Sequence, residues 1–406
     1  MRAAAFVAPY LLEATARFID AAARLPGVRL GLVTQEPADR LPPQLRSSLA
    51  AHWRVDDALD PHQVAVAVRG LERQLGPVER LVAALEQLQV PLAEVREALQ
   101  IPGMDVETAR NFRDKARMKD VLRAAGVPCA RHALVTDAAG ALAFLDDVGY
   151  PVVAKPPAGA GAKSTFRLDG PAELHEWLAI APPAPDRPML LEEFLTGEEH
   201  SLESVMVDWQ PVWHSVSRYL PTPLEVLRNP WMQWVVLLPR QVEGQEYAEI
   251  RDVGSAALRA LGLRTGLTHM EWFRRPDGSV AVSEVGARPP GAQIMSLLSY
   301  AYEVDFPTSW AQLMVLDSFS PPERRWSVGA AYLRGQGSGR VRAVHGVAEL
   351  HRELGHLVVE ARLPRAGQLP SGSYEGDGYV LVRHGETEVV AEALRRIVSG
   401  LRVELG

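Results

Sequence analysis

The stretch that decides the fold is His269-Met-Glu271-Trp-Phe-Arg-Arg-Pro-Asp277-Gly278-Ser-Val-Ala-Val-Ser-Glu284-Val-Gly286. It contains two strand-like runs joined around Asp-Gly, which is a preferred two-residue hairpin turn because both central residues need positive φ. Counting outward from a two-residue turn at Asp277-Gly278 places Trp272 opposite Ser283 and Glu271 opposite Glu284. The sequence therefore predicts a hairpin that holds two glutamates face to face.

Paired glutamates of this kind define a candidate metal site. Cross-strand Cβ atoms lie about 5 Å apart, and two like charges placed there repel each other unless something neutralises them. Mg²⁺ is suited to this role because it takes oxygen ligands and completes its shell with water and nucleotide phosphates. We therefore predict Glu271 and Glu284 as metal ligands, with His269 opposite Gly286 on the same face.

The two faces of the hairpin are expected to differ. The buried face is predicted to carry Met270, Trp272, Ala281 and Val285, and the carboxylate face to carry Phe273 and Val282. The apolar pair on the carboxylate face favours a partly covered cleft over the alternative, a solvated hairpin whose glutamates face water. A zinc site that uses His269 with both glutamates is disfavoured, because zinc prefers more nitrogen or sulfur ligands.

A second motif begins where Lys155 ends an apolar strand. The small residues that follow, up to Thr165, include Gly159, Gly161, Lys163 and Ser164. Glycines let backbone N–H groups close over phosphate oxygens, and lysines add positive charge. The run is not a Walker A loop, because Ala162 stands where that pattern needs glycine. A simple turn between strands is the alternative, but the position between Lys155 and the hairpin favours a phosphate-binding loop.

Composition limits the protein class. The chain has 406 residues, 47% of them hydrophobic and 23% charged, which indicates a globular protein of two to four domains. A formal charge of −7 argues against nucleic-acid binding, and no apolar run is long enough to span a membrane. The single cysteine, Cys129, excludes an internal disulfide and predicts a cytoplasmic location.

The order of elements predicts a mixed α/β chain in four parts. A βαβ rhythm opens with a buried strand at Ala3–Val7 but lacks a G-x-G-x-x-G fingerprint, so a dinucleotide site is not expected. One helix is predicted from Thr108 to Ala125. The predicted parts are an N-terminal Rossmann-like domain (1–105), a small subdomain with the glycine-rich loop (106–190), a larger subdomain with the metal site (191–320) and a C-terminal α/β unit (321–406).

This order of motifs resembles the ATP-grasp superfamily, and most closely its carboxylate-amine ligases, which include L-amino acid ligases and carnosine-synthase-like enzymes. The residues that carry the resemblance are Asp114-Lys115, Lys155 with its loop, the acidic run Leu191–Ser201, Gly266–Glu271 and Glu284–Gly291. The resemblance covers most of the chain. It implies the ATP-grasp fold, with central ATP-binding subdomains.

The resemblance also implies roles for single residues. Lys115 and Lys155 would bind the α- and β-phosphates of ATP, and Gly159 to Thr165 would form the loop over them. Glu192, Glu193, Phe194 and Leu195 would form the hinge that meets adenine, with backbone groups of Glu193 and Leu195 bonding the ring, and Glu199 would hold the ribose. Glu271 and Glu284 would bind one or two Mg²⁺ ions, with Mn²⁺ as a substitute, and Arg288 would contact the reacting phosphate or the substrate carboxylate.

One position departs from the family pattern. The family usually has asparagine two residues after the second glutamate, and this chain has Gly286. The second metal ion is therefore in doubt.

The implied function is an ATP-dependent ligase that joins a carboxylate to an amine through an acyl phosphate, giving an amide or dipeptide, ADP and phosphate. Lys155 and Arg288 would be the catalytic residues. The implied partners are small carboxylates and amines, amino acids among them, with a homodimer as the expected assembly. The alternatives are a biotin-carboxylase-like or purine-pathway enzyme that activates bicarbonate or formate, and a nucleotide-binding protein without turnover.

Overall fold

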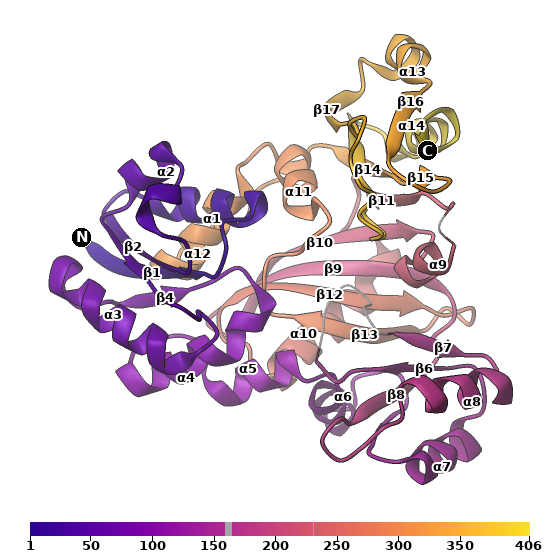
Figure 1. The fold of residues 1–406 in the computed structure, drawn as a ribbon, viewed down its shortest axis with the longest axis horizontal. Helices are drawn as coiled ribbons and strands as arrows, with labels where there is room; N and C mark the ends of the chain where they lie inside the picture. The colour runs from indigo at the N-terminus through magenta and orange to yellow at the C-terminus, as the bar shows by residue number, and fades with distance from the viewer. Residues whose placement is uncertain (159–164, 230) are drawn as a thin grey trace.

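A computed structural model describes residues 1–158, 165–229 and 231–406 (Figure 1). The N-terminal part is a four-stranded parallel sheet with strand order β3-β2-β1-β4. Its strands are β1 (Arg2–Ala8), β2 (Val28–Thr34), β3 (Ala51–Arg54) and β4 (Arg80–Val82), and its helices are α1 (Glu13–Ala23), α2 (Pro43–Ser48), α3 (Pro61–Leu75) and α4 (Gln89–Leu99). The first strand is almost fully buried, so the predicted βαβ rhythm and the buried opening strand are confirmed.

The single helix predicted from Thr108 to Ala125 is wrong, because the chain breaks at Asp114. Two helices stand there, α5 (Val106–Arg113) and α6 (Lys115–Ala124). The Asp114 backbone is extended, and its side chain accepts hydrogen bonds from the backbone N–H groups of Ala116 and Arg117. An aspartate in this position satisfies free N–H groups at a helix start, and it places Lys115 at the first position of α6.

A small antiparallel sheet follows, with strand order β5-β8-β6-β7. Its elements are β5 (His132–Val135), α7 (Ala138–Val148), β6 (Val152–Lys155), β7 (Phe166–Leu168), α8 (Pro171–Ile180) and β8 (Met189–Glu193). The two helices cover one face of this sheet (Figure 1), and buried Trp177 of α8 lies in the core between them. Lys155 and Glu192 are thereby placed at the ends of neighbouring strands.

The central layer is an eight-stranded antiparallel sheet with order β13-β12-β9-β10-β11-β14-β18-β17. Its strands are β9 (Glu198–Val207), β10 (Gln210–Leu220), β11 (Trp234–Leu238), β12 (Gly266–Arg274), β13 (Val280–Gly286), β14 (Ser327–Leu333), β17 (Val358–Arg362) and β18 (Gly378–His384). The sheet runs across residue 320, where the sequence predicts a boundary. The C-terminal unit therefore shares a continuous sheet with the part before it.

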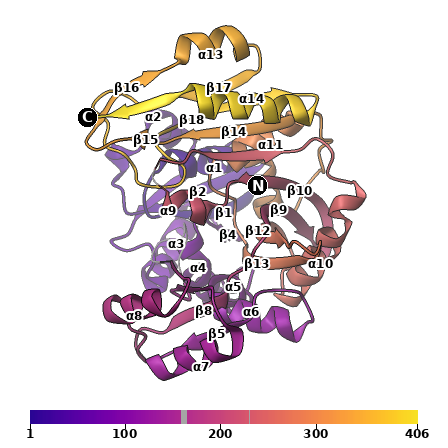
Figure 2. The ribbon, with the colours of Figure 1, turned by 90° about the vertical axis from the view of Figure 1, so that its right-hand side faces the viewer.

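The two faces of the central sheet have different cores. Met270 and Trp272 of β12 face α10 (Ala248–Ala260), whereas Leu267 lies in the cluster with α11 (Ile294–Tyr302) and α12 (Phe306–Leu316). At the C-terminal end, α14 (Thr387–Gly400) packs on β14 (Figure 2). The remaining elements are α9 (Pro223–Arg228), β15 (Gly335–Gln336), β16 (Val341–His345), α13 (Val347–Leu354), β19 (Arg402–Leu405) and the short 3₁₀ turns Ala38–Arg40, Glu86–Leu88 and Gln245–Tyr247.

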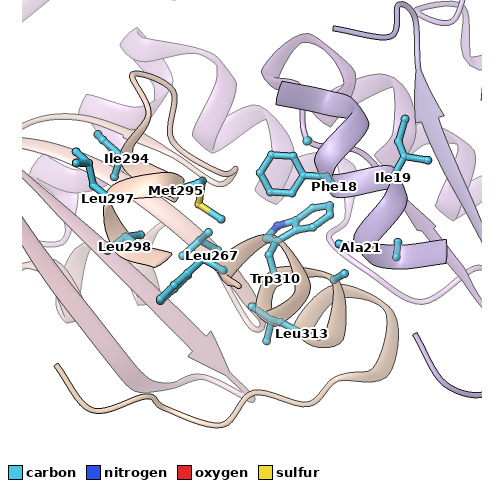
Figure 3. Packing of buried hydrophobic residues seen from close by; sticks show 14 of the residues in the cluster. Phe18, Ile19, Ala21, Leu267, Ile294, Met295, Leu297, Leu298, Trp310 and Leu313 are labelled. Carbon is cyan, nitrogen blue, oxygen red and sulfur yellow. The ribbon is translucent and has the colours of Figure 1, made fainter. Parts of the chain in front are cut away.

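The N-terminal part is joined to the central part by an aromatic contact. Trp310 of α12, 2% exposed, packs edge-on against Phe18 of α1 with ring centroids 5.0 Å apart (Figure 3). It also packs edge-on against Phe6 of β1 at 6.1 Å. The same cluster includes residues of α11 and β12. One continuous core therefore fixes the N-terminal part against the central sheet.

Among the residues that the structure describes, no helix combines the length and the apolar character needed to cross a membrane.

We expect Trp310→Ala to lower the free energy of unfolding by about 3–5 kcal/mol, because it removes a buried indole and leaves a cavity between the two parts. Urea unfolding followed by circular dichroism measures the change. The matched control is Trp231→Ala, since that indole is 62% exposed, and it should change stability little. Equal losses in the two variants would contradict the assigned role of Trp310.

Candidate active site

The hairpin β12–β13 places the two glutamates as predicted. Glu271 pairs with Glu284 and His269 with Gly286 across the antiparallel ladder. Neither glutamate is exposed: their side chains are 33% and 25% accessible. The central geometric prediction is therefore confirmed.

The turn and the strand pairing that produce this register differ from the predicted ones. The turn has three residues, 276–278, because the Arg275 N–H donates to the Ser279 carbonyl at 2.8 Å and Gly278 has φ 86°. A β-bulge beyond Glu271 then pairs Trp272 with Val282, which leaves Ser283 as the extra residue. The longer turn and the bulge shift the register in opposite directions, so they cancel at Glu271.

These two shifts reverse the predicted faces of two residues. Val282 lies in the core with Trp272, whereas Ala281 pairs with Phe273 and belongs to the small cluster around that side chain. The predictions that Val282 shares the carboxylate face and that Ala281 faces the opposite core are therefore wrong. Met270, Trp272 and Val285 lie in the core as predicted.

Glu271 lies in a buried network of charges on the face it shares with β9. His269 Nδ1 is 2.8 Å from Glu203 Oε1, and its Nε2 is 3.8 Å from Glu271 Oε1. Burial opposes the charge on His269, but the hydrogen bond to Glu203 and the nearby charge of Glu271 raise its pKa to about 9. Burial likewise raises the pKa of Glu271, but His269 outweighs this and the pKa is lowered. Glu271 is therefore held ionised.

Glu199 of β9 lies on the same face of the sheet and pairs with Phe273 of β12. Its side chain is buried, and burial, then the charge of Glu271, raises its pKa well above the usual value. The sequence analysis did not select Glu203. The alternation of Glu199, Ser201 and Glu203 along one strand face was the available signal.

Two lysines reach the site from different elements. Lys115 Nζ is 2.8 Å from Glu284 Oε1, and Lys155 Nζ is 2.7 Å from Glu192 Oε2. Burial lowers the pKa of Lys155, but Glu192 and then Glu284 outweigh it, so the pKa is raised. Both lysines, predicted to bind phosphate, are thus positioned by carboxylates of the site.

A third lysine, which the sequence analysis did not select, supports Glu192. Lys119 is 1% exposed, and its Nζ lies 3.3 Å from Glu192 Oε1 and donates to the Ser283 carbonyl at 2.8 Å. Burial raises the pKa of Glu192, but Lys119 and Lys155 outweigh it and lower the pKa. Glu192, predicted to contact the cofactor, therefore acts in this structure as an anchor for Lys155 and for the bulge.

The predicted adenine hinge, Glu192 to Leu195, begins in the last two residues of β8. The Glu193 carboxylate lies 3.3 Å from Nε of Arg131, and the guanidinium of Arg167 stacks 4.2 Å from the centre of the Phe194 ring. Thr165 also faces this region. The other predicted loop residues, Gly159, Gly161, Lys163 and Ser164, lie outside the described residues.

Arg288 is held from the N-terminal part. Its Nε is 3.0 Å from Glu86 Oε2, and Arg113 Nη1 is 2.9 Å from the other oxygen of that carboxylate. Glu86 is 8% exposed and was not selected from the sequence, because its partners are distant along the chain. This shared carboxylate fixes the guanidinium that the family resemblance assigns to substrate or phosphate.

These side chains line one cavity of about 720 Å³. Of the residues predicted for the site, it is lined by Lys115, Lys155, Thr165, Glu192, Glu193, Phe194, Leu195, Glu199, Glu271, Glu284 and Arg288. The structure also places Glu86, Tyr219, Trp234, Tyr374 and Glu375 around it. Carboxylates, lysines and an arginine from four parts of the sequence thus line one cavity, whose volume is in the range typical of small-molecule binding sites.

The donor set fits Mg²⁺. Within the described part of the chain, no three His, Cys, Asp or Glu side chains form a metal-binding group. Glu271 and Glu284 supply two carboxylates, and Mg²⁺ is usually bound by one or two carboxylates with water and phosphate oxygens completing its octahedral shell.

Comparison with known proteins agrees with this geometry. Residues 114–288 match the family of the ATP-binding domain of the carbamoyl-phosphate synthase L chain. The chain is 27% identical over 280 residues to an uncharacterised protein of Sinorhizobium fredii, a match that spans 63% of this chain and 55% of that protein. It is 22% identical over 287 residues to the L-arginine-specific L-amino acid ligase of Bacillus subtilis, covering 68% and 67% of the two chains.

Solved structures show the same fold. The L-amino acid ligase of Bacillus licheniformis superimposes with a TM-score of 0.78 at 20% identity, over 100% of this chain and 99% of that one. N5-carboxyaminoimidazole ribonucleotide synthetase of Thermotoga maritima gives 0.70 at 17% identity over both whole chains. The chain therefore has the ATP-grasp fold, and its residues 114–288 are similar to the ATP-binding domain of that family. Apart from the uncharacterised protein, the relatives and neighbours named here are ligases and a synthetase, in agreement with the predicted enzyme class.

We expect Glu192→Gln to lower the free energy of unfolding at pH 7 by about 3 kcal/mol, because it leaves the buried Lys119 without a charged partner. The pKa of Glu192 is lowered in the folded state, so its stabilisation is present above its unfolded pKa and is lost as the pH falls through the folded value. The variant should therefore lose less stability than the wild type on acidification. Urea unfolding at pH 7 and pH 4 measures both effects.

The control for this variant is Glu176→Gln, on the exposed side of α8. A wild-type acid dependence in Glu192→Gln would contradict the ion-pair network.

Proposed function

We propose that the chain is an ATP-dependent carboxylate-amine ligase that forms an amide or dipeptide bond and releases ADP and phosphate. The observation that carries the proposal is the single cavity in which the Glu271–Glu284 pair lies with Lys115, Lys155 and Arg288. A carboxylate pair for a cation, two ammonium groups and a guanidinium are the groups that phosphoryl transfer requires, because this chemistry depends on positioning and charge neutralisation.

The proposed reaction has two steps. An oxygen of the substrate carboxylate attacks the γ-phosphorus of ATP, the bond from that phosphorus to the bridging oxygen breaks, and ADP and an acyl phosphate result. An amine then attacks the acyl carbon, phosphate leaves, and the amine nitrogen loses a proton. Water must be kept from the acyl phosphate during this second step, because it would hydrolyse the intermediate.

The residues have separate tasks in this scheme. Lys115 and Lys155 bind the phosphates, and Arg288, fixed by Glu86, orients the carboxylate against the γ-phosphate. Glu193 to Leu195 contact adenine, and Glu199 contacts the ribose. Glu271 and Glu284 would hold Mg²⁺, which would supply positive charge to neutralise the phosphates.

Amino acids are the proposed substrates, because similarity to two proteins named as L-amino acid ligases supports them. One or two Mg²⁺ ions, a homodimer and a cytoplasmic location complete the proposal. The four sequence parts, 1–105, 106–190, 191–320 and 321–406, are kept as the proposed domains.

A second candidate function is activation of bicarbonate or of another small acid. Structural neighbours named as N5-carboxyaminoimidazole ribonucleotide synthetase favour it. An ADP-release assay decides between the two. Release that depends on pairs of amino acids supports the ligase, release that depends on bicarbonate or formate supports the second candidate, and nucleotide binding without release indicates a protein without turnover.

We expect Glu284→Ala to abolish ADP release while the protein remains folded, because one half of the cation site is removed. Coupled ADP detection and circular dichroism measure the two properties. Glu249→Ala, on the exposed side of α10, is the matched control and should retain activity. Normal turnover by Glu284→Ala would remove the metal assignment.

Gly286→Asn tests the departure from the family pattern. A β-carbon at this position would lie 3.4 Å from Arg288 Cγ, a side-chain atom, and the backbone φ is not in the left-handed region. Asparagine should therefore fit and add an amide oxygen beside Glu284, so we expect ADP release to reach half its maximum at a lower Mg²⁺ concentration. A magnesium titration checks this, with Gly286→Ala as the control that adds a β-carbon but no ligand; identical curves would contradict it.

A further inference from the structure

The C-terminal unit contributes two neighbouring side chains to the cavity. Tyr374 and Glu375 lie in the segment between β17 and β18, and they are the described residues after 320 that line the cavity. Neither residue belongs to the predicted nucleotide or metal site. Because both side chains line the cavity, they are candidates for contact with a bound substrate.

Glu375 differs in its partners from most of the other carboxylates around the cavity; Glu199, like Glu375, forms no ion pair among the described residues. Glu86, Glu192, Glu193, Glu271 and Glu284 each have a basic side chain within 4.0 Å. Among the described residues, Glu375 has no such partner, and its carboxylate accepts a hydrogen bond from the backbone of Ala292. Burial raises its pKa, and within the described part of the chain no basic side chain offsets this cost to the ionised form.

The surroundings of Glu375 suit an organic cation. The Tyr374 ring meets the indole of Trp234 edge-on at 4.8 Å, and Tyr219 meets the same indole at 5.3 Å. All three aromatic side chains line the cavity. Aromatic rings beside a carboxylate form a favourable environment for an ammonium group, through the ring quadrupole and charge-assisted hydrogen bonds.

Glu375 is also close to the reacting end of the cavity. Its Oε1 lies 4.0 Å from the place where a β-carbon on Gly291 would stand, and Gly291 is three residues from Arg288 in the same loop. Burial raises the pKa of Tyr374, and the charges of Glu375 and Glu271 raise it further, whereas Arg288 lowers it. An anion-binding group and an unpaired carboxylate therefore face one space.

We propose that Glu375, beside the rings of Tyr374 and Trp234, binds the ammonium group of the amino acid whose carboxylate is activated. This inference rests on the proposed ligase function and specifies its donor substrate as a zwitterion. The carboxylate of the amino acid points toward Arg288 and its ammonium group toward Glu375. An acid without a free amine then lacks one of the two anchors.

A purely structural role for Glu375 predicts a different result. Ala292 and Gln293 have φ values of 50° and 55°, and the Tyr332 hydroxyl donates to the Ala292 carbonyl. If Glu375 only supported this strained turn, its loss would lower kcat for every donor alike. Recognition of ammonium predicts instead an effect on KM that is confined to donors with a free amine.

The test uses the full chain with MgATP and an excess of hydroxylamine as a common nucleophile, so that only the donor varies. Donors are L-arginine and L-alanine, each compared with its N-acetyl derivative, and hydroxamate and ADP are both measured. The variants are Glu375→Gln and the control Glu349→Gln, whose side chain is on exposed α13. Binding of the same four compounds with a non-hydrolysable ATP analogue is followed by saturation-transfer NMR.

We expect the wild type to prefer the free amino acids. Glu375→Gln should raise the KM for these donors about tenfold or more, because one charge-assisted hydrogen bond is lost. The kcat and the KM for ATP should change little. Equal use of free and acetylated donors by the wild type, or an equal effect of Glu375→Gln on both, would overturn the inference while leaving the ligase intact. If the wild type releases no ADP with any amino acid, the ligase proposal fails. The NMR result then decides: selective binding of free amines that Glu375→Gln abolishes supports the ammonium site, and its absence overturns it.

Discussion

The candidate site depends on several glutamate carboxylates that lie close together and are partly buried. Glu271 and Glu284 face each other across a hairpin, and Glu199 lies on the neighbouring strand. Such an arrangement is stable in the free protein only if cations are supplied from elsewhere. Each of the paired carboxylates has one: His269 beside Glu271, and Lys115 beside Glu284.

These cations come from elements that are far apart in the sequence, so the charge balance also determines tertiary structure. Lys115 is presented by a helix that starts where Asp114 caps it, and Lys119 of the same helix reaches both Glu192 and the bulged Ser283. Arg288 is tied to the N-terminal part through Glu86. Nucleotide phosphates entering the cavity would meet lysines already placed by carboxylates, which lowers the cost of ordering them on binding.

The sequence predicted what depends on local pattern and missed what depends on folding. Turn chemistry and strand alternation were enough to pair Glu271 with Glu284, although the turn is longer than predicted and a bulge compensates for it. Asp114 is followed by a helix-forming run, so the sequence predicted that it lies inside one long helix. An aspartate that caps a helix and one inside a helix differ in backbone conformation, and the extended backbone of Asp114 is visible only in the structure. Glu86, Lys119, Glu203 and Glu375 carry no local signal strong enough to select them, since their partners are brought close only by the tertiary structure.

The bulge at Ser283 has a consequence for how this hairpin tolerates change. The register of the two strands differs by one residue between the two sides of Ser283: Trp272 pairs with Val282 on the turn side, and Glu271 pairs with Glu284 on the cavity side. If the same residues formed a two-residue turn at Asp277-Gly278 and a regular ladder without the bulge, the same two acids would still lie opposite each other. More than one turn geometry is therefore compatible with this pairing of the two glutamates, provided that the strand compensates for the difference before Glu284.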